Sequence, residues 1–295
     1  MIETLQTIFP SCTYSNDAKS VTTAAYQWFI TKENEMIGIR KDELMNRDLT
    51  LLSAFLTPYH VKLPAMSRNE QLWTKLVHNG DIPATMHHVN NYRFVYFSFP
   101  INQLDPSAFK EAIQAIFTSE IAILWENDHT GIIVEIDDKG LSYEQIVDVL
   151  MSDLYVKIKF YVGEYHKDLQ QAKSYYNRLL NDAPAAFSYT KDNVISYMYA
   201  IPYLIVDQAD HTFLQMLAET VLKDILQDAE ILETIEAFIQ HNLNISVTAK
   251  VLYMHRNSLQ YRIDKFIEKT GIDIRQFQAA MTVKLALLAK KHLDL

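Results

Sequence analysis

The sequence predicts an α+β chain of 295 residues, and three observations predict this class. Two runs rich in β-formers lie near the N-terminus with a polar turn between them. Between residues 83 and 182, strand-like and helical patterns follow one another in the order β-α-β-β-α-β. From residue 183 onward the apolar residues recur almost entirely at helical spacing. The length permits two or three hydrophobic cores.

Residues 1–82 are predicted to form a small α+β unit, which we interpret as a reduced sensor. Its expected elements are a helical turn in Met1–Pro10, strands in Val21–Ile30 and Glu35–Arg40 around the turn Thr31–Asn34, and helices in Arg47–Tyr59 and Glu70–His78. The segment that contains Pro64 is expected to be a loop between the two helices.

Residues 83–182 are predicted to form a split β-α-β-β-α-β domain, in which helices cover one face of an antiparallel sheet. The expected strands are Arg93–Phe99, Ile121–Glu126, Gly131–Ile136 and Val156–Val162, and the expected helices are Pro106–Phe117, Tyr143–Leu154 and a further one, Leu169–Leu180. The polar, proline-containing segment Asn181–Phe187 is expected to be a linker.

Residues 183–229 are predicted to be a helical connector. Asn193–Val206 is apolar and rich in tyrosine, with Pro202 as an interruption, and Phe213–Ile225 has apolar residues at helical spacing. We expect this connector to pack on the middle domain and to carry the C-terminal domain.

Residues 230–295 are predicted to be a helix-turn-helix domain. Ile231–Ile239 forms a supporting helix that stops at His241-Asn242, and Ser246 is expected to cap a short helix, Val247–Leu252. Tyr253-Met254 forms the turn, and the second helix runs from about Arg256 to Lys269.

Two further signals are expected to close this domain. Gly271 fits the left-handed position that ends a helix. Asp273 and Gln276 are expected to form a capping pair before a last helix. The apolar stripe expected on that helix is Phe277, Met281, Leu285 and Leu288.

The outer face of the second helix has the residue types that read DNA grooves. Arg can bond guanine through two hydrogen bonds, and Asn or Gln can do the same with adenine, close to the start of a recognition helix. The expected base-reading residues are Arg256, Asn257 and Gln260. The residues expected to contact the DNA backbone are Ser246, Ser258, Tyr261, Arg262 and Lys265. His255 is expected to pack against this helix or to cap it.

The net charge of −9 by itself opposes a nucleic-acid partner, but the distribution of the charge along the chain does not. Residues 230–295 hold 9 Lys and Arg against 7 Asp and Glu, a charge of +2, whereas residues 1–229 hold 18 against 29, a charge of −11. Phosphate attraction acts over about one Debye length, so the charge at the contact matters most.

The cellular setting expected from the composition is the cytoplasm. The single cysteine, Cys12, cannot form an internal disulfide. No secretory start is visible, and no stretch reaches the roughly 18 apolar residues that a membrane helix requires, so no membrane partner is expected.

The C-terminal residues resemble a known signature. Those that carry the resemblance are Thr248-Ala249, Leu252, His255-Arg256-Asn257-Ser258-Leu259, Tyr261-Arg262 and Thr270-Gly271. They are similar to the C-terminal signature of the PucR/CdaR family of bacterial transcriptional regulators, and the match covers about the last quarter of the chain. The resemblance implies an effector-responsive activator or repressor, without indicating its target genes.

The middle domain resembles, in its element order, the degenerate GGDEF-like domain of many members of this family. A working nucleotide cyclase is not expected, because the hairpin Trp125–Gly131 has no paired glycines and the chain after the first strand reads Phe99-Pro100-Ile101-Asn102. Adjacent histidines, His87-His88, point to opposite sides of an extended strand and have no third ligand, so no metal is expected. No cofactor is expected either.

The leading hypothesis is a regulator that binds double-stranded operator DNA as a homodimer or larger homo-oligomer, with a small-molecule effector bound in residues 1–182 or at their junction with the connector. One alternative is that the C-terminal helices dock a protein partner without DNA. The other is an active nucleotide cyclase.

Overall fold

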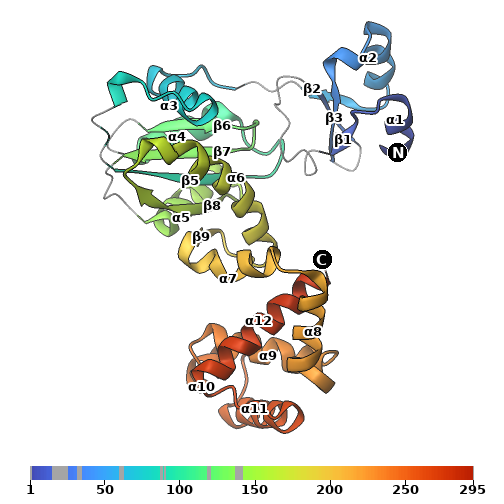
Figure 1. The fold of residues 1–295 in the computed structure, drawn as a ribbon, viewed down its shortest axis with the longest axis vertical. Helices are drawn as coiled ribbons and strands as arrows, with labels where there is room; N and C mark the ends of the chain where they lie inside the picture. The colour runs from blue at the N-terminus through green and yellow to red at the C-terminus, as the bar shows by residue number, and fades with distance from the viewer. Residues whose placement is uncertain are drawn as a thin grey trace. The chain divides into compact units, whose positions relative to one another are not determined.

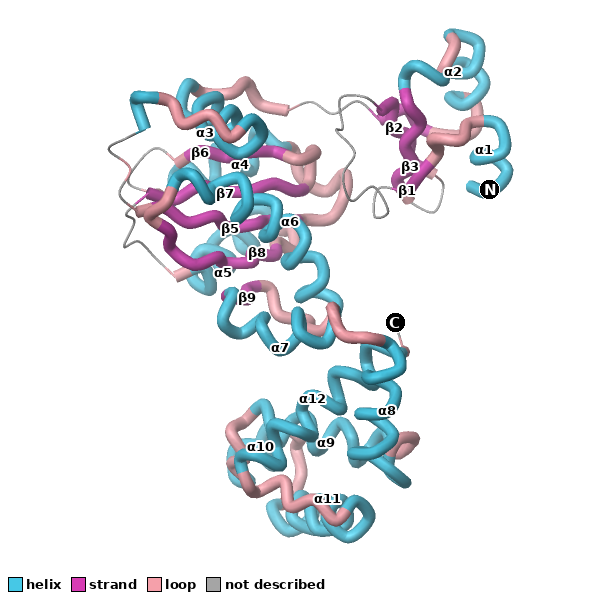
Figure 2. Tube along the Cα trace, in the orientation of Figure 1, coloured by secondary structure: helices cyan, strands magenta, loops and turns pink. Residues whose placement is uncertain are grey.

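The structure is a computed structural model, and it divides into two compact units. It describes residues 2–14, 26–31, 35–59, 63–86, 89, 91–117, 121–136 and 142–294. The first unit is Met1–Ala183 with Asp192–Ser196, and the second is Pro184–Lys191 with Tyr197–Leu295 (Figure 1). In Figure 2 every labelled strand belongs to the first unit, while the described part of the second consists of helices and loops. Among the described residues, no helix is both long and apolar enough to cross a bilayer.

The first sheet confirms the predicted N-terminal hairpin. Its elements are α1 (Ile2–Ile8), β1 (Thr13–Tyr14), β2 (Tyr26–Ile30), β3 (Met36–Arg40), α2 (Asn46–Ser53) and β4 (Thr57–Tyr59). The antiparallel strand order is β1-β3-β2-β4, with Trp28 opposite Gly38. Phe29, Ile37 and Ile39 are completely buried and form the centre of its core.

The helix predicted at Arg47–Tyr59 is too long. It ends at Ser53, and Thr57–Tyr59 instead forms β4 on the edge of the sheet, where Pro58 lies opposite Phe29. Proline cannot continue a helix but is tolerated in an edge strand, because its missing N–H is not required there. Residues 21–25 of the first predicted strand, 32–34 of the turn, and His87-His88 lie outside the described residues.

The second sheet has the predicted β-α-β-β-α-β order. Its elements are α3 (Arg68–Asn79), β5 (Tyr92–Ser98), α4 (Pro106–Ile116), β6 (Ala122–Trp125), β7 (Thr130–Ile136), α5 (Tyr143–Leu154), β8 (Lys159–His166), α6 (Ala172–Ser188) and β9 (Val194–Ser196). The strand order is β6-β7-β5-β8-β9; the neighbours are antiparallel except β8 and β9, which are parallel.

Helices pack on both faces of this sheet, which corrects the expectation that one face is covered. Phe109 of α4 and Ile146 of α5 join the core cluster that contains Val95 and Phe97 of β5. On the opposite face, Trp73 of α3 and Tyr176 of α6 contact Phe94, which precedes Val95 in β5, with ring centroids 5.9 and 5.8 Å away. The helix α3, grouped by sequence with residues 1–82, therefore packs on the second sheet.

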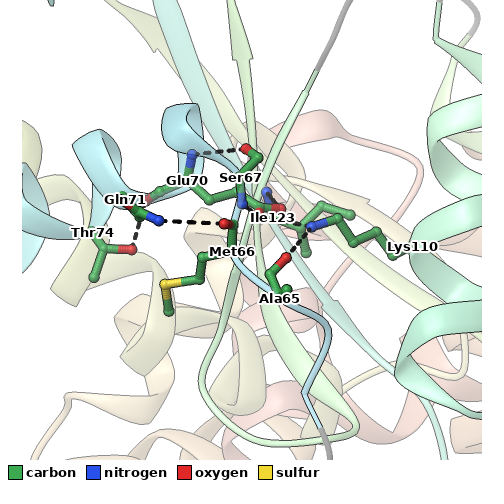
Figure 3. Close-up of polar contacts among 8 residues, drawn as sticks. All are labelled: Ala65, Met66, Ser67, Glu70, Gln71, Thr74, Lys110 and Ile123. Carbon is green, nitrogen blue, oxygen red and sulfur yellow. Dashed lines mark hydrogen bonds and ion pairs between the residues drawn. The ribbon is translucent and has the colours of Figure 1, made fainter.

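A buried carboxylate accepts a hydrogen bond from the edge strand β6 of the second sheet. Glu70, in α3, accepts hydrogen bonds from the Ile123 backbone N–H of edge strand β6 at 3.2 Å and from Lys110 Nζ of α4 at 2.7 Å (Figure 3). Its side chain also closes a capping box with Ser67 at the start of α3. One buried side chain thus connects α3, α4 and the sheet.

The linker predicted at Asn181–Phe187 is wrong. These residues continue α6 as far as Ser188, although Pro184 lies inside the helix. Ala183 and Ala186 are completely buried. The burial of these residues compensates for the backbone hydrogen bond that the proline cannot donate.

The second unit is built from α7 (Tyr197–Asp207), α8 (His211–Leu222), α9 (Ala229–Gln240), α10 (Ile245–Val251), α11 (Arg256–Thr270) and α12 (Phe277–Leu293). Its core gathers Leu222, Ile235, Phe238, Ile263 and Phe266, all at most 1% exposed. The helices predicted at the C-terminus are therefore present, and α8 supplies part of the core that they share.

The last helix differs from the prediction at its start and in its buried face. Asp273 accepts hydrogen bonds from Arg275, and the N-cap Gln276 makes no side-chain capping bond. Of the predicted apolar stripe, Phe277 and Met281 are exposed, whereas Leu288 is buried and Leu285 packs partly buried against the same core. Val283, Ala286 and Ala289 are completely buried, and the small alanines allow close helix packing.

Candidate nucleic-acid interface

The first helix of the predicted motif, α10, begins one residue before Ser246. Its N-cap is Asn244, whose Oδ1 accepts from the backbone N–H groups of Ser246 and Val247 at 3.0 and 3.1 Å. Ser246 therefore does not cap the helix, and its side chain is exposed in the first turn. Asparagine and serine are about equally favoured at the N-cap, so Asn244, two residues earlier, was an equally good N-cap candidate in the sequence.

The turn predicted at Tyr253-Met254 is confirmed. The Met254 N–H donates to the Ala249 carbonyl at 2.9 Å, which closes the C-terminal end of α10. Tyr253 has a left-handed backbone, with φ of 52°, and its side chain is 98% exposed. The turn places α11 beside α10, while Ala249 and Thr248 are buried between them.

The second helix of the motif, α11, is fixed at both ends and along its inner face. His255 is the N-cap, and its Nδ1 accepts from the Asn257 N–H at 3.3 Å, as the expected capping role requires. Gly271 ends the helix with φ of 77°. Leu259, Ile263 and Phe266 are completely buried, so the opposite face is held outward.

The first turns of α11 leave a polar, cationic surface open. Arg256, Asn257 and Ser258 are exposed, and Tyr261 is 69% exposed. Within the described part of the chain, the Arg256 and Asn257 side chains form no hydrogen bond or ion pair. Gln260 is partly exposed and donates to Asp264 at 2.9 Å. These groups can therefore meet a ligand without first losing a strong internal contact, apart from that of Gln260.

A second row of cations on α11 faces the start of α9 instead. Arg262 Nη1 donates to Thr234 Oγ1 at 3.0 Å, and its Nη2 pairs with Glu230. Lys265 and Lys269 lie 4.0 and 3.7 Å from Asp228 Oδ2. A hollow of about 490 Å³ lies beside this row. Its lining residues are Glu230, Ile231, Asn257, Ser258, Tyr261, Arg262 and Lys265.

Seven of the eight predicted site residues fall into two groups. The first turns of α11 carry Arg256, Asn257, Ser258, Gln260 and Tyr261, while Arg262 and Lys265 approach acidic groups of α9. The acidic partners were not predicted, although Asp228 precedes a helical period and is a favoured N-cap type. Ser246 is exposed on α10, outside both groups.

Carboxylates of the hairpin Trp125–Gly131 and of β7 are engaged with neighbouring side chains. Glu126 accepts from the Tyr176 hydroxyl, and Asp128 lies 2.8 Å from His129 Nδ1. Glu135, only 1% exposed, accepts from the Tyr143 hydroxyl and from Arg93. Burial, followed by the nearby Glu135 carboxylate, raises the pKa of Tyr143. These contacts are those of a packed domain.

Two helices joined by a tight turn, with a supporting helix before them and a closing helix after them, define a helix-turn-helix domain. Residues 231–289 match the family described as the PucR C-terminal helix-turn-helix domain. This C-terminal domain is that of the PucR/CdaR family of transcriptional regulators.

The chain is similar to several known proteins, two of which are named as regulators. An uncharacterised Bacillus subtilis protein, YxkF, is 28% identical over 95% of this chain and 96% of its own length. The proline-responsive transcriptional activator PutR of B. subtilis is 31% identical over 44% of this chain. The carbohydrate diacid regulator of Escherichia coli is 37% identical over 18% of it. The matched residues span 34% of the length of PutR and 14% of the length of the carbohydrate diacid regulator.

Proposed function

We propose that this transcription regulator binds operator DNA through α11 as a homodimer or larger homo-oligomer, and that a small molecule controls the binding. The observation that carries the proposal is the exposed start of α11, where the Arg256 and Asn257 side chains form no hydrogen bond or ion pair with the residues that the structure describes. Arg256 and Asn257 occupy its first turn, where recognition helices present base-reading side chains. In this proposal Arg256, Asn257 and Gln260 read bases, and Ser258 and Tyr261 contact the DNA backbone.

The packing of α11 supports this role. Its buried residues lock the helix against α9 and α10, so the side chains on its outer face keep a fixed mutual arrangement. A fixed arrangement lowers the entropy lost when several hydrogen bonds form together. Ser246 lies exposed in the first turn of α10, the helix that crosses the DNA backbone in this type of motif, which supports its proposed phosphate contact.

Effector control is proposed for the first unit, whose middle domain we interpret as GGDEF-like. A hollow of about 870 Å³ lies there with mixed polar and apolar lining: Ile82, Val89, Asn91, Lys167, Asp168, Leu169 and Gln170. It has the size of small-molecule sites in other proteins. The four-part division into residues 1–82, 83–182, 183–229 and 230–295 stays a prediction.

The decisive experiment recovers, from fragmented bacterial genomic DNA, the fragments that the full-length protein retains. A labelled recovered fragment is then titrated with protein at several salt concentrations. DNA binding predicts that log K falls linearly with log salt, by about 0.9 for each neutralised phosphate. Retention of no preferred fragment would contradict the proposal, as would an affinity that is the same for random DNA.

The rival proposal, docking of a protein partner by the C-terminal helices, predicts that salt changes the affinity little. Sedimentation of the free and DNA-bound protein tests the oligomeric state, because one helix-turn-helix reads only a few base pairs and a two-fold assembly supplies the remaining affinity. A turnover of GTP that is lost in Glu126→Gln would favour the cyclase alternative.

A further inference from the structure

We propose that Arg262 is a positioning residue that sets α11 against α9, held by Glu230 and Thr234, and that it makes no phosphate contact. This inference rests on the proposed function, in which α11 reads DNA. It changes the role predicted for Arg262 from the sequence, where its charge and position on the outer face indicated a contact to the DNA backbone.

The guanidinium of Arg262 is held at two points. Nη1 donates to Thr234 Oγ1 at 3.0 Å, and Nη2 donates to the Glu230 carboxylate. Thr234 is 1% exposed, and its own hydroxyl proton is donated to the Glu230 carbonyl at 2.8 Å. Because the Thr234 hydroxyl donates its proton to the Glu230 carbonyl, Oγ1 can only accept from Arg262. This acceptor sets the direction of the Nη1–H group of Arg262.

The two contacts join opposite parts of the motif. Glu230 and Thr234 lie one helical turn apart on α9, while Arg262 lies in the middle of α11. A planar guanidinium that bonds two acceptors on one helix restricts the rotation of the other helix about its own axis. That rotation determines which side chains at the start of α11 face outward.

The charge of Arg262 is already balanced where it lies. The Glu230 carboxylate pairs with it, while Lys265 and Lys269 lie 4.0 and 3.7 Å from Asp228. A phosphate that bound Arg262 would have to approach or displace the Glu230 carboxylate, and like charges that are close together repel. By contrast, the Arg256 and Asn257 side chains form no such contacts among the described residues.

The test uses the full-length protein and one recovered DNA fragment. The variants are Glu230→Gln, Arg262→Ala and the double variant, with Glu233→Gln as the control. Glu233 lies exposed on the same helix, and its substitution changes the net charge equally. If Arg262 positions α11, Glu230→Gln and Arg262→Ala each weaken binding by roughly threefold to tenfold, and the double variant is no weaker than Arg262→Ala.

The salt dependence decides between positioning and phosphate contact. Positioning predicts that the slope of log K against log salt stays at the wild-type value in all variants. A phosphate contact predicts that Arg262→Ala reduces the slope by about 0.9. It also predicts that Glu230→Gln tightens binding, because a competitor for Arg262 is removed. Either of these two results overturns the proposal.

A measurement without DNA separates this inference from the proposed function. In urea unfolding of the free protein, the effects of Glu230→Gln and Arg262→Ala should be coupled, with the second substitution costing less after the first. Additive effects overturn the positioning role, whatever happens with DNA. If the two substitutions have coupled effects on stability but the protein binds no DNA, the positioning contact is supported. The proposed function then fails.

Discussion

Lys110 Nζ lies 2.7 Å from Glu70 Oε2, so that α4 is joined to α3 by one ion pair (Figure 3). The Glu70 side chain is 2% exposed and also accepts from the Ile123 N–H on the sheet edge. Removal of the carboxylate would leave the Ile123 N–H without its acceptor, and would leave the Lys110 ammonium with the Ala65 carbonyl, 3.2 Å away, as its acceptor among the described residues. The pair is therefore expected to matter more for the stability of the first unit than a surface ion pair would.

Glu70→Ala should lower the free energy of unfolding of the first unit by about 3 kcal/mol, because the substitution removes the ion pair of Lys110 and the acceptor of the Ile123 and Ser67 N–H groups. Urea denaturation followed by tryptophan fluorescence measures this change, since Trp73 lies on the same helix. Glu111→Ala, at an exposed position of α4, should change stability by less than about 0.5 kcal/mol. Equal effects of the two substitutions would contradict the prediction.

Much of the fold follows from local patterns in the sequence. The β-α-β-β-α-β order, the helical C-terminus and the left-handed Gly271 are predictable because each depends on residues that are close along the chain. The elements that were predicted wrongly depend on packing between residues that are far apart along the chain. Thr57–Tyr59 forms a strand because β2 offers a partner, and α6 continues through Pro184 because its alanines are buried.

The candidate site shows the same division. The outward direction of Arg256 and Asn257 follows from helical periodicity around Leu259 and Ile263. The partners of Arg262 could not be predicted, because Thr234 lies 28 residues earlier and meets it only after α9 and α11 have packed. Periodicity indicates which face is outward but does not identify the groups that a neighbouring helix places beside it.

His255→Ala should lower stability by about 1 kcal/mol, because the substitution removes the side-chain acceptor at the N-cap of α11. His255→Asn should retain most of it, since asparagine is a favoured N-cap residue. The control is His211→Ala, at an exposed position just after the capping residue of α8, Asp210. The urea concentrations at the midpoints of unfolding of the three variants test this predicted order of stability. A loss in His255→Asn as large as that in His255→Ala would contradict the capping role.

Tyr253→Val should destabilise the second unit by about 1 kcal/mol or more, whereas Tyr253→Gly should not. Tyr253 has φ of 52°, a conformation that is especially unfavourable for a β-branched residue and freely accessible to glycine. Its side chain is 98% exposed, so little packing is lost in either variant. Thermal unfolding of both variants tests the difference, and a less stable glycine variant would show that the tyrosine side chain itself contributes.

The stability of the first unit should depend on pH through His166. Burial is the main cause that lowers the pKa of His166 in the folded protein, with a smaller effect of Arg178, while Glu164 opposes them. A depressed folded-state pKa means that the neutral ring favours the folded state. The contribution of the neutral His166 ring to stability is therefore fully present above the unfolded pKa of about 6.5. This contribution is lost as the pH falls through the folded pKa.

His166→Phe should weaken this dependence on pH. The phenyl ring can keep the stacking on Tyr175, whose ring centroid lies 3.6 Å away, but it cannot be protonated. Melting temperatures between pH 8 and pH 5 should fall less in the variant than in the wild type. Above pH 7.5 the difference between the two proteins should be constant. An unchanged slope below pH 6.5 would show that His166 does not contribute.

Arg256→Ala should weaken binding to the preferred DNA fragment by about 1–3 kcal/mol and relax the base preference at one position, because a bidentate contact to a base edge is lost. Arg275→Ala is the matched control. Arg275 carries the same charge in the same domain, but its guanidinium already bonds Asp273, with Nε 2.7 Å from Oδ1. Binding titrations against a set of fragments mutated one base pair at a time measure both affinity and preference. An Arg256→Ala variant with wild-type affinity and preference would remove Arg256 from the reading surface and leave Asn257 and Gln260 as its candidates.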